Sequence, residues 1–279
     1  MDKHPASDIL NPPLNDMAAQ PLVRADAWQA LRQHTAARIA LGRVGASLPT
    51  AEVLRLGLAH AQARDAVHTP LDFAALCQLL HADDWQPQLV RSQALNRQSY
   101  LLRPDLGRRL HADDANRLRQ HAGPNPVCEL AIVVADGLSS AAVQHHAAPL
   151  LAALKKHLQT DWATTPLVLA EQGRVALGDD IGELLGARLV VLLIGERPGL
   201  SSPASLGIYI TFSPRIGRMD SERNCISNVR PEGLPYDQAA HKLAWLCRAA
   251  LRGQVTGVAL KDDSQIQPLA AYCTPGRPW

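Results

Sequence analysis

Hydrophobic residues change their spacing partway along the chain. In the first part they recur at helical intervals: Ala51, Leu54 and Leu58 fall on one face after Thr50, and residues 73–80 repeat this spacing. In the second part, short apolar runs alternate with helical stretches, which is typical of a parallel sheet with crossover helices. The pattern predicts an α/β fold, with a Rossmann-like, mostly parallel sheet domain preceded by a smaller, mostly α-helical N-terminal domain.

The second part contains four apolar runs that we expect to form strands. The first has no polar alternation, which indicates burial on both faces of a sheet. The last alternates with a period of two, as expected nearer a sheet edge. The predicted strands are residues 130–135, 165–169, 188–194 and 206–212, and a final helix is expected to start near Pro235.

Two prolines and a glycine interrupt the chain at residues 123–126, where they can continue neither a helix nor a strand. We therefore place a domain boundary there. The first residues are rich in proline and poor in apolar periodicity, which favours an extended arm. The predicted parts are an N-terminal arm at 1–22, a mostly helical domain at 23–122, a sheet domain at 127–255 and a C-terminal tail at 256–279.

Composition narrows the class of protein. The chain has 279 residues, 47% of them hydrophobic, which is enough for a substantial core. The formal net charge is +2 and the arginines are dispersed, so nucleic acid is not the expected partner. The apolar runs are far shorter than the ~20 residues that span a bilayer, and we see no secretory signal. Five widely spaced cysteines fit neither a disulfide framework nor a zinc site, which favours a reducing cytoplasm.

Three polar loops follow predicted strands, at residues 136–140, 173–175 and 195–199. Ligands of open parallel sheets bind beyond the carboxyl ends of the strands, so these loops are candidate sites. The third combines two glycines with Glu196 and Arg197, held by a proline. A simple surface turn, with these two side chains paired to each other, explains the same residues. Likewise, Asp136 has a structural alternative as a cap of the helix that opens near Ser139.

The common enzymatic motifs are absent from the sequence: it contains no dinucleotide-binding glycine motif, phosphate-binding loop, nucleophile elbow or zinc-protease helix. His145 and His146 point in different directions on a helix and have no acidic or thiol partner at ligand spacing, so no metal site is predicted. Cys225 has no neighbouring base and is better explained as a small apolar residue than as a nucleophile.

Six stretches resemble, in order, the small subunit of adenosylcobalamin-dependent ethanolamine ammonia-lyase. Each stretch alone is a weak signal, but together they are specific and cover about residues 23 to 255. The stretches are residues 37–45, 100–109, 134–139, 181–187, 195–199 and 224–228.

The resemblance implies a two-subunit lyase that converts ethanolamine to acetaldehyde and ammonia by adenosyl-radical rearrangement. It places the substrate site in the barrel of the large subunit, so this chain carries no catalytic residue. The family's cobalamin contacts carry over to Val175, Glu196 and Cys225, each expected in a loop near a strand end or turn. Since the chain lacks a D-x-H-x-x-G loop, the cobalamin should keep its own benzimidazole as the lower ligand.

The resemblance also bears on assembly and location. It implies a hetero-oligomer of paired subunits. Four arginines in the resembling stretches are our candidates for contacts with the large subunit, and the alternative is that they simply lie on a solvent-exposed face. Some family members carry a longer amphipathic leader linked to bacterial microcompartments; the short, proline-rich arm here favours a free cytoplasmic complex. The candidate contact residues are Arg38, Arg43, Arg108 and Arg109.

Two other hypotheses remain open. One is a self-sufficient α/β enzyme, either a hydrolase that uses Asp136 with Ser139 or a nucleotide-binding enzyme with its site in the same crevice. The other is a purely structural subunit that shapes the assembly and makes no cofactor contact.

Overall fold

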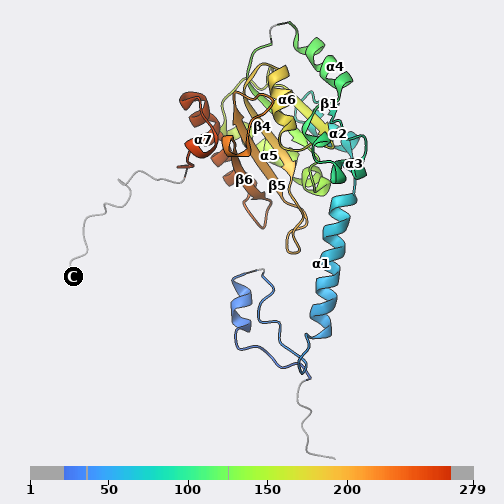
Figure 1. The fold of residues 1–279 in the computed structure, drawn as a ribbon. Helices are drawn as coiled ribbons and strands as arrows, with labels where there is room; N and C mark the ends of the chain where they lie inside the picture. Colours follow the sequence, from blue (N-terminus) through green and yellow to red (C-terminus); the bar gives the residue numbers. More distant parts are fainter. Residues whose placement is uncertain (1–21, 36, 125, 265–279) are drawn as a thin grey trace, which may run out of the picture. The chain divides into compact units, whose positions relative to one another are not determined.

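The computed structural model describes residues 22–35, 37–124 and 126–264 (Figure 1). Nearly all of the predicted N-terminal arm, Asn125 in the predicted boundary and the part of the predicted tail after residue 264 lie outside the described residues. The chain divides into two compact units, Met1–Leu58 and Ala59–Trp279.

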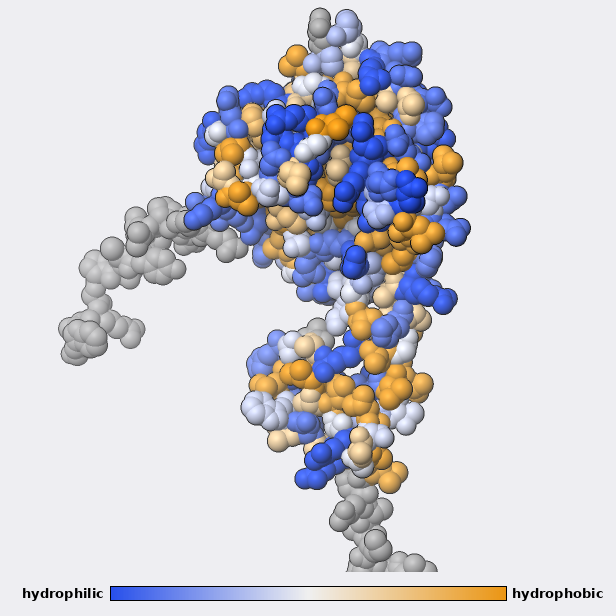
Figure 2. Space-filling model, in the orientation of Figure 1, coloured by the Kyte–Doolittle hydropathy of each residue, from blue (hydrophilic) through white to orange (hydrophobic). Residues whose placement is uncertain are grey.

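In the first unit, a short 3-10 helix η1 (Gln29–Gln33) precedes the start of helix α1 (Thr50–His68). The predicted helix after Thr50 is therefore present. Its apolar face is not buried, because Leu54 and Leu58 are 68% and 60% exposed. Figure 2 shows such apolar residues on the visible surface of this unit.

In the described residues of the second unit, six strands form one mixed sheet in the order β1-β3-β2-β4-β5-β6 (Figure 1). The first four strands in this order are parallel, and β5 and β6 run antiparallel to their neighbours. The α/β class and all four predicted strands are confirmed. The strands are β1 (Gln88–Arg91), β2 (Cys128–Ala135), β3 (Leu167–Glu171), β4 (Ala187–Gly195), β5 (Leu206–Phe212) and β6 (Asn224–Val229).

Strand β1 lies within the range that the sequence predicts to be mostly helical. It pairs in parallel with β3, so residues before the 123–126 break contribute an edge strand to the sheet. The break does end a helix, α4 (Ala112–Ala122), at Gly123 with φ 83°. The compact units nevertheless divide between Leu58 and Ala59 and not at the break. A four-residue strand with one buried residue, Val90, is too short to give a recognisable pattern.

Helices cover both faces of the sheet (Figure 1). One face packs against α5 (Ser140–His157) and α7 (Tyr236–Gly253), and the other against α4 and α6 (Leu177–Leu184). The central strands are apolar over most of their length because both of their faces are buried there, and exposed charged residues occur only near their ends. The predicted last helix is confirmed as α7, which buries one apolar stripe. The remaining helices are α2 (Phe73–His81), α3 (Arg97–Leu102), η2 (Leu106–Arg108), η3 (Asp220–Glu222) and η4 (Gly257–Ala259).

The two antiparallel strands present different side chains to the two faces. Ile208 and Ile226 pack into the core beneath α5 and α7. Tyr209, one position along β5, packs instead against the core on the α6 side. Cys225 and Ser227 of β6 are exposed. This part of the sheet therefore offers a half-exposed polar surface on the α6 side.

Candidate functional site

The three loops predicted to meet at the carboxyl ends of the strands do meet. The amide of Leu138 donates to the carbonyl of Gly195 at 2.9 Å, which joins the β2 loop to the β4 loop. The amide of Gly173 donates to Asp136 Oδ1 at 3.0 Å, which joins the β3 loop to the β2 loop. The three loops are thus hydrogen-bonded to one another at the carboxyl ends of β2, β3 and β4.

Asp136 connects the loops that follow β2 and β3. Its carboxyl group is buried, accepts from the amides of Gly137 and Gly173, and lies 3.7 Å from Arg97 Nη1. Burial raises the pKa of Asp136 to about 6, although Arg97 and the backbone donors counteract the rise. Ser139, and not Asp136, caps helix α5 by accepting from the amide of Ala142.

These contacts weigh against a hydrolase built on Asp136 and Ser139. The Ser139 side chain is fully buried and donates to the carbonyl of Pro203 at 3.0 Å. A nucleophilic hydroxyl needs a base within hydrogen-bond reach and access to substrate. Ser139 instead has a backbone acceptor and no exposed surface.

The raised pKa of Asp136 gives a prediction about stability and pH. The native state holds the Asp136 proton up to about pH 6, whereas the unfolded chain releases it near pH 4. Between these values the native state binds more protons, so stability conferred by the neutral group is lost as pH rises. Asp136→Asn removes this titration. We expect wild type to lose on the order of 2 kcal/mol relative to this variant between pH 4 and 7, measured by urea unfolding.

The control for this experiment is Asp105→Asn. Asp105 is exposed and Arg103 lowers its pKa, so it stays ionised across the same pH range. The difference between this variant and wild type should change only slightly from pH 4 to 7, and in the opposite direction, because here the unfolded chain binds more protons near pH 4. If the difference for Asp136→Asn is nearly constant as well, Asp136 does not hold its proton in the native state.

Glu196 follows directly after strand β4 and is half-buried. Its carboxylate accepts from the hydroxyl of Ser205 at 2.5 Å and from the amide of Asn228 at 3.1 and 3.2 Å. Among the described residues it forms no ion pair with Arg197, so the paired surface turn is not what forms. A carboxylate has about four acceptor positions, which leaves Glu196 able to accept a further hydrogen bond.

The two glycines of this loop differ in the space beside their backbone. A Cβ atom on Gly195 would lie 2.1 Å from the carbonyl oxygen of Ser139 and 2.7 Å from that of Asp136. The chain's own β2 loop therefore occupies the space that Gly195 leaves. A Cβ atom on Gly199 would have Ser202 O at 3.6 Å as its nearest neighbour. Of the two glycines, Gly195 is therefore enclosed by the protein itself, while Gly199 remains open.

Cys225 lies in strand β6, not in a loop as expected from the sequence, and pairs in register with Tyr209 of β5. The strand was missed because its residues alternate polar and apolar with few hydrophobic positions. Desolvation raises the pKa of the Cys225 thiol, Glu196 adds to the rise, and the Tyr209 hydroxyl, hydrogen-bonded to it, opposes it. Since thiolates and not thiols are nucleophilic, Cys225 is poorly suited to attack a substrate.

Val175 lies in the turn before α6, as the sequence predicted for a loop residue, and is half-buried. It packs against the same core as Tyr209. Tyr209 in turn pairs with Cys225, and the charge of Glu196 raises its pKa further after burial. Tyr209 therefore connects Cys225 and Glu196, and Val175 packs against the same core on the α6 side of the sheet. Sequence reasoning missed Tyr209 because it occurs as an ordinary member of an alternating strand.

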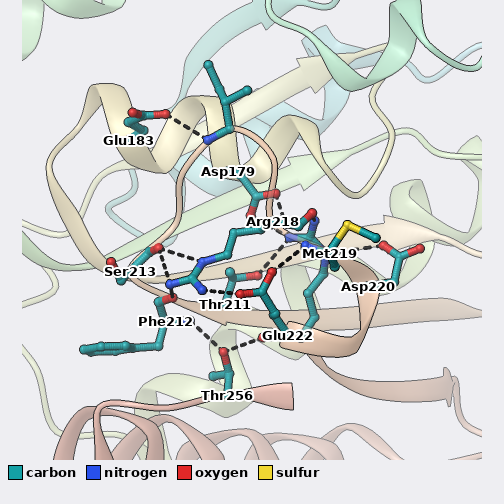
Figure 3. A network of polar contacts seen from close by, with 12 residues as sticks. Asp179, Glu183, Thr211, Phe212, Ser213, Arg218, Met219, Asp220, Glu222 and Thr256 are labelled. Atoms are coloured by element: carbon teal, nitrogen blue, oxygen red, sulfur yellow. Dashed lines mark hydrogen bonds and ion pairs between the residues drawn. The ribbon is translucent and has the colours of Figure 1, made fainter. Parts of the chain in front are cut away.

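A buried polar network adjoins this surface (Figure 3). Arg223 Nη1 contacts both carboxylate oxygens of Asp179, at 2.6 and 2.7 Å, and both side chains are almost fully buried. Burial raises the pKa of Asp179 to about 6, so it is ionised at neutral pH. Arg218 pairs with Glu222 and donates to the carbonyls of Phe212 and Ser213. The network fixes the segment that leads into β6.

Other candidate residues have structural partners. His146 hydrogen-bonds the hydroxyl of Tyr236 at 2.8 Å, while its neighbour His145 is exposed. Among the arginines proposed for subunit contacts, Arg109 pairs with Asp180 at 3.0 Å and Arg108 is exposed. None of the helices in the described segments is both long enough and apolar enough to cross a bilayer.

A family model and individual known proteins that match this chain carry the same enzyme name. The family model described as ethanolamine ammonia-lyase light chain (EutC) matches residues 25–261. A protein of Azotobacter vinelandii named ethanolamine ammonia-lyase small subunit is 59% identical over 244 residues, covering 87% of this chain and 90% of that protein. Proteins with the same name from Ralstonia nicotianae and Pseudomonas fluorescens are 56% and 54% identical, covering 89% and 91% of this chain and 93% of each relative.

Proposed function

Because the chain belongs to the ethanolamine ammonia-lyase light chain family, we propose that it is the small subunit of that carbon–nitrogen lyase and helps to bind adenosylcobalamin. In this proposal the substrate site lies in a larger partner subunit, and the isolated chain is inactive. The sheet that carries the contacts is Rossmann-like, and the complex is a cytoplasmic hetero-oligomer. A bacterial microcompartment is the less favoured location.

One observation carries the proposal: Val175, Glu196 and Cys225 come from three separate segments on the α6 side of the sheet, where Tyr209 pairs with Cys225 and the charge of Glu196 raises the pKa of Tyr209. The surface is half-exposed, as a partner-shared ligand site requires. It carries a carboxylate with acceptor positions left over, a tyrosine hydroxyl and a thiol held neutral. A corrin ring is rimmed by neutral amide groups, which need such acceptors and donors.

In the proposed mechanism, adenosylcobalamin would, when bound, supply the radical chemistry for the conversion of ethanolamine. The residues of this chain bind and orient the cofactor. Glu196 accepts a hydrogen bond from an amide of the cofactor, and Ser205 and Asn228 hold its carboxylate in place. Val175 and Cys225 contribute packing and backbone groups. Neither Cys225 nor Asp136 transfers a proton, because the thiol stays protonated and Asp136 is enclosed.

The test is a titration of adenosylcobalamin into the complex with the large subunit, followed by absorbance. Replacing Glu196 by alanine should weaken binding by about 1–3 kcal/mol, roughly 5- to 150-fold, since a ligand hydrogen bond to a charged acceptor is lost. Glu196→Gln keeps an acceptor and should weaken binding less. Aldehyde production from ethanolamine should require both subunits.

The control is Glu129→Ala, which removes a carboxylate that is 58% exposed on strand β2. It should leave cobalamin affinity unchanged. Unchanged affinity in Glu196→Ala would instead support a purely structural subunit. Full activity of the large subunit alone would contradict the proposal. If the isolated chain turned over phosphoesters or nucleotides, and Asp136→Asn abolished this turnover, the hypothesis of a self-sufficient enzyme would be supported.

A further inference from the structure

A pocket of about 300 Å³ adjoins Val175 and is lined by four arginines. Arg108 comes from η2, Arg174 precedes Val175, and Arg218 and Arg223 come from the segment before β6. The lining also includes Asp220, whose side chain is 93% exposed and lies 3.5 Å from Arg223 Nε. The pocket lies on the α6 side of the sheet, as the proposed cofactor contacts do, because Arg223 contacts Asp179 of α6 and Thr211 of β5.

Two of the four arginines already have carboxylate partners. Figure 3 shows Arg218 beside Glu222, and Asp179 and Asp220 in the same network. Arg223 is neutralised by Asp179, with which it is buried. The positive charges of Arg218 and Arg223 are therefore largely balanced by the protein itself.

The other two arginines have no carboxylate partner among the described residues. Arg174 stacks on the ring of Tyr100 at 4.3 Å and donates to the Tyr100 carbonyl, while its Nε is buried without a hydrogen-bond partner. Arg108 is exposed, and in the described part of the chain its side chain forms neither an ion pair nor a hydrogen bond. These two guanidinium groups leave the pocket with an excess of positive charge.

Helix α6 adds backbone donors to the same pocket. Its N-cap residue, Ala176, provides no capping side chain. The amides of Val175 and Ala176, both pocket residues, find no acceptor within the described segments. Free amides at a helix N-terminus, together with the helix dipole, favour an anion. Two arginines without a carboxylate partner in the described segments and two residues with free amides thus line one small cavity.

We propose that this pocket binds a phosphoryl group, namely the phosphodiester in the nucleotide loop of the cobalamin cofactor; this assignment rests on the proposed function. Guanidinium groups match the geometry of phosphate oxygens and bind them in charge-assisted hydrogen bonds. The cavity is at the lower limit of ligand-pocket size, so it accommodates a fragment and not a corrin ring. The phosphodiester is the charged fragment of a cofactor whose ring periphery is neutral.

The experiment uses two corrinoids that differ in one phosphate group, adenosylcobinamide phosphate and adenosylcobinamide. Each is titrated into the complex with the large subunit and followed by absorbance. We expect wild type to bind the phosphate form about tenfold more tightly, and Arg108→Gln to remove most of that preference. Arg108→Glu, which reverses the charge, should invert it. Because Arg108 is exposed and its side chain has no partner within residues 22–35, 37–124 and 126–264, neither variant should disturb folding.

The matched control is Arg252→Gln, which removes one exposed positive charge at the end of α7 and should keep the preference. If Arg108→Gln and Arg108→Glu leave the preference intact, the pocket does not bind the cofactor's phosphate. Equal binding of both corrinoids by wild type, with inorganic phosphate raising the thermal stability only when Arg108 is present, would assign the pocket to free phosphate and overturn the proposal.

Failure here is distinguishable from failure of the proposed function. Glu196→Ala should weaken binding of both corrinoids by the same factor, because Glu196 is proposed to contact a ring amide. If Glu196→Ala weakens both and Arg108→Gln weakens neither, the cofactor site stands and the phosphate assignment falls. If Glu196→Ala weakens neither, the proposed function itself loses its support.

Discussion

Replacing Arg223 with methionine is expected to lower the free energy of unfolding by about 3–5 kcal/mol, measured by urea denaturation at pH 7. Arg223 neutralises Asp179, and both side chains are at most 3% exposed. Without the guanidinium, the carboxyl group of Asp179 stays buried without its partner, and either its charge or its protonation then costs free energy. Arg223 also donates to the carbonyl of Arg218 at 2.7 Å, a contact that methionine cannot replace.

Two further variants test whether the destabilisation comes from leaving Asp179 without its partner or simply from removing an arginine. In Arg103→Met the partner is Asp105, and both side chains of that pair are more than half exposed, so little change in stability is expected. The double variant Asp179→Leu, Arg223→Met removes both buried charges and should recover much of the stability. If Arg223→Met is as mild as Arg103→Met, the buried pair does not stabilise the fold.

The strands that the sequence predicted share one physical property. Residues 130–135 and 189–194 are buried on both faces, so they form uninterrupted apolar runs, which are typical of central strands. Strands β1 and β6 were missed because each lies at an edge of the sheet and buries few residues, such as Val90 and Ile226. Short edge strands depend on pairing with a neighbour, which local periodicity does not record.

The candidate site was less predictable than the fold. The loops after β2, β3 and β4 could be placed together, since carboxyl ends of parallel strands meet at one edge. The roles of Glu196 and Cys225 came from a family resemblance and not from spacing. The pair of Asp179 and Arg223 joins residues 44 positions apart, so its existence depends on the folded register of the sheet and α6. No local motif marks such a pair.

Gly195 packs against the β2 loop and directly precedes Glu196. Gly195→Ala is expected to lower the free energy of unfolding by about 3 kcal/mol. The added methyl group would lie 2.1 Å from the carbonyl oxygen of Ser139, so the backbone of one loop must move. The same loop carries the hydrogen bond from Leu138 to Gly195, which the movement would stretch. Urea denaturation of the variant measures the effect on stability.

Gly199→Ala is the matched control, because it adds the same group four residues along the same loop. Its nearest neighbour would be 3.6 Å away, an ordinary van der Waals distance, so stability should change little. Equal effects of the two substitutions would show that the β2 and β4 loops are not tightly packed. Since Glu196 follows Gly195 directly, a shift of this backbone also displaces its carboxylate from Asn228. We therefore expect Gly195→Ala, unlike Gly199→Ala, to weaken cobalamin binding by the complex at temperatures where the variant is still folded.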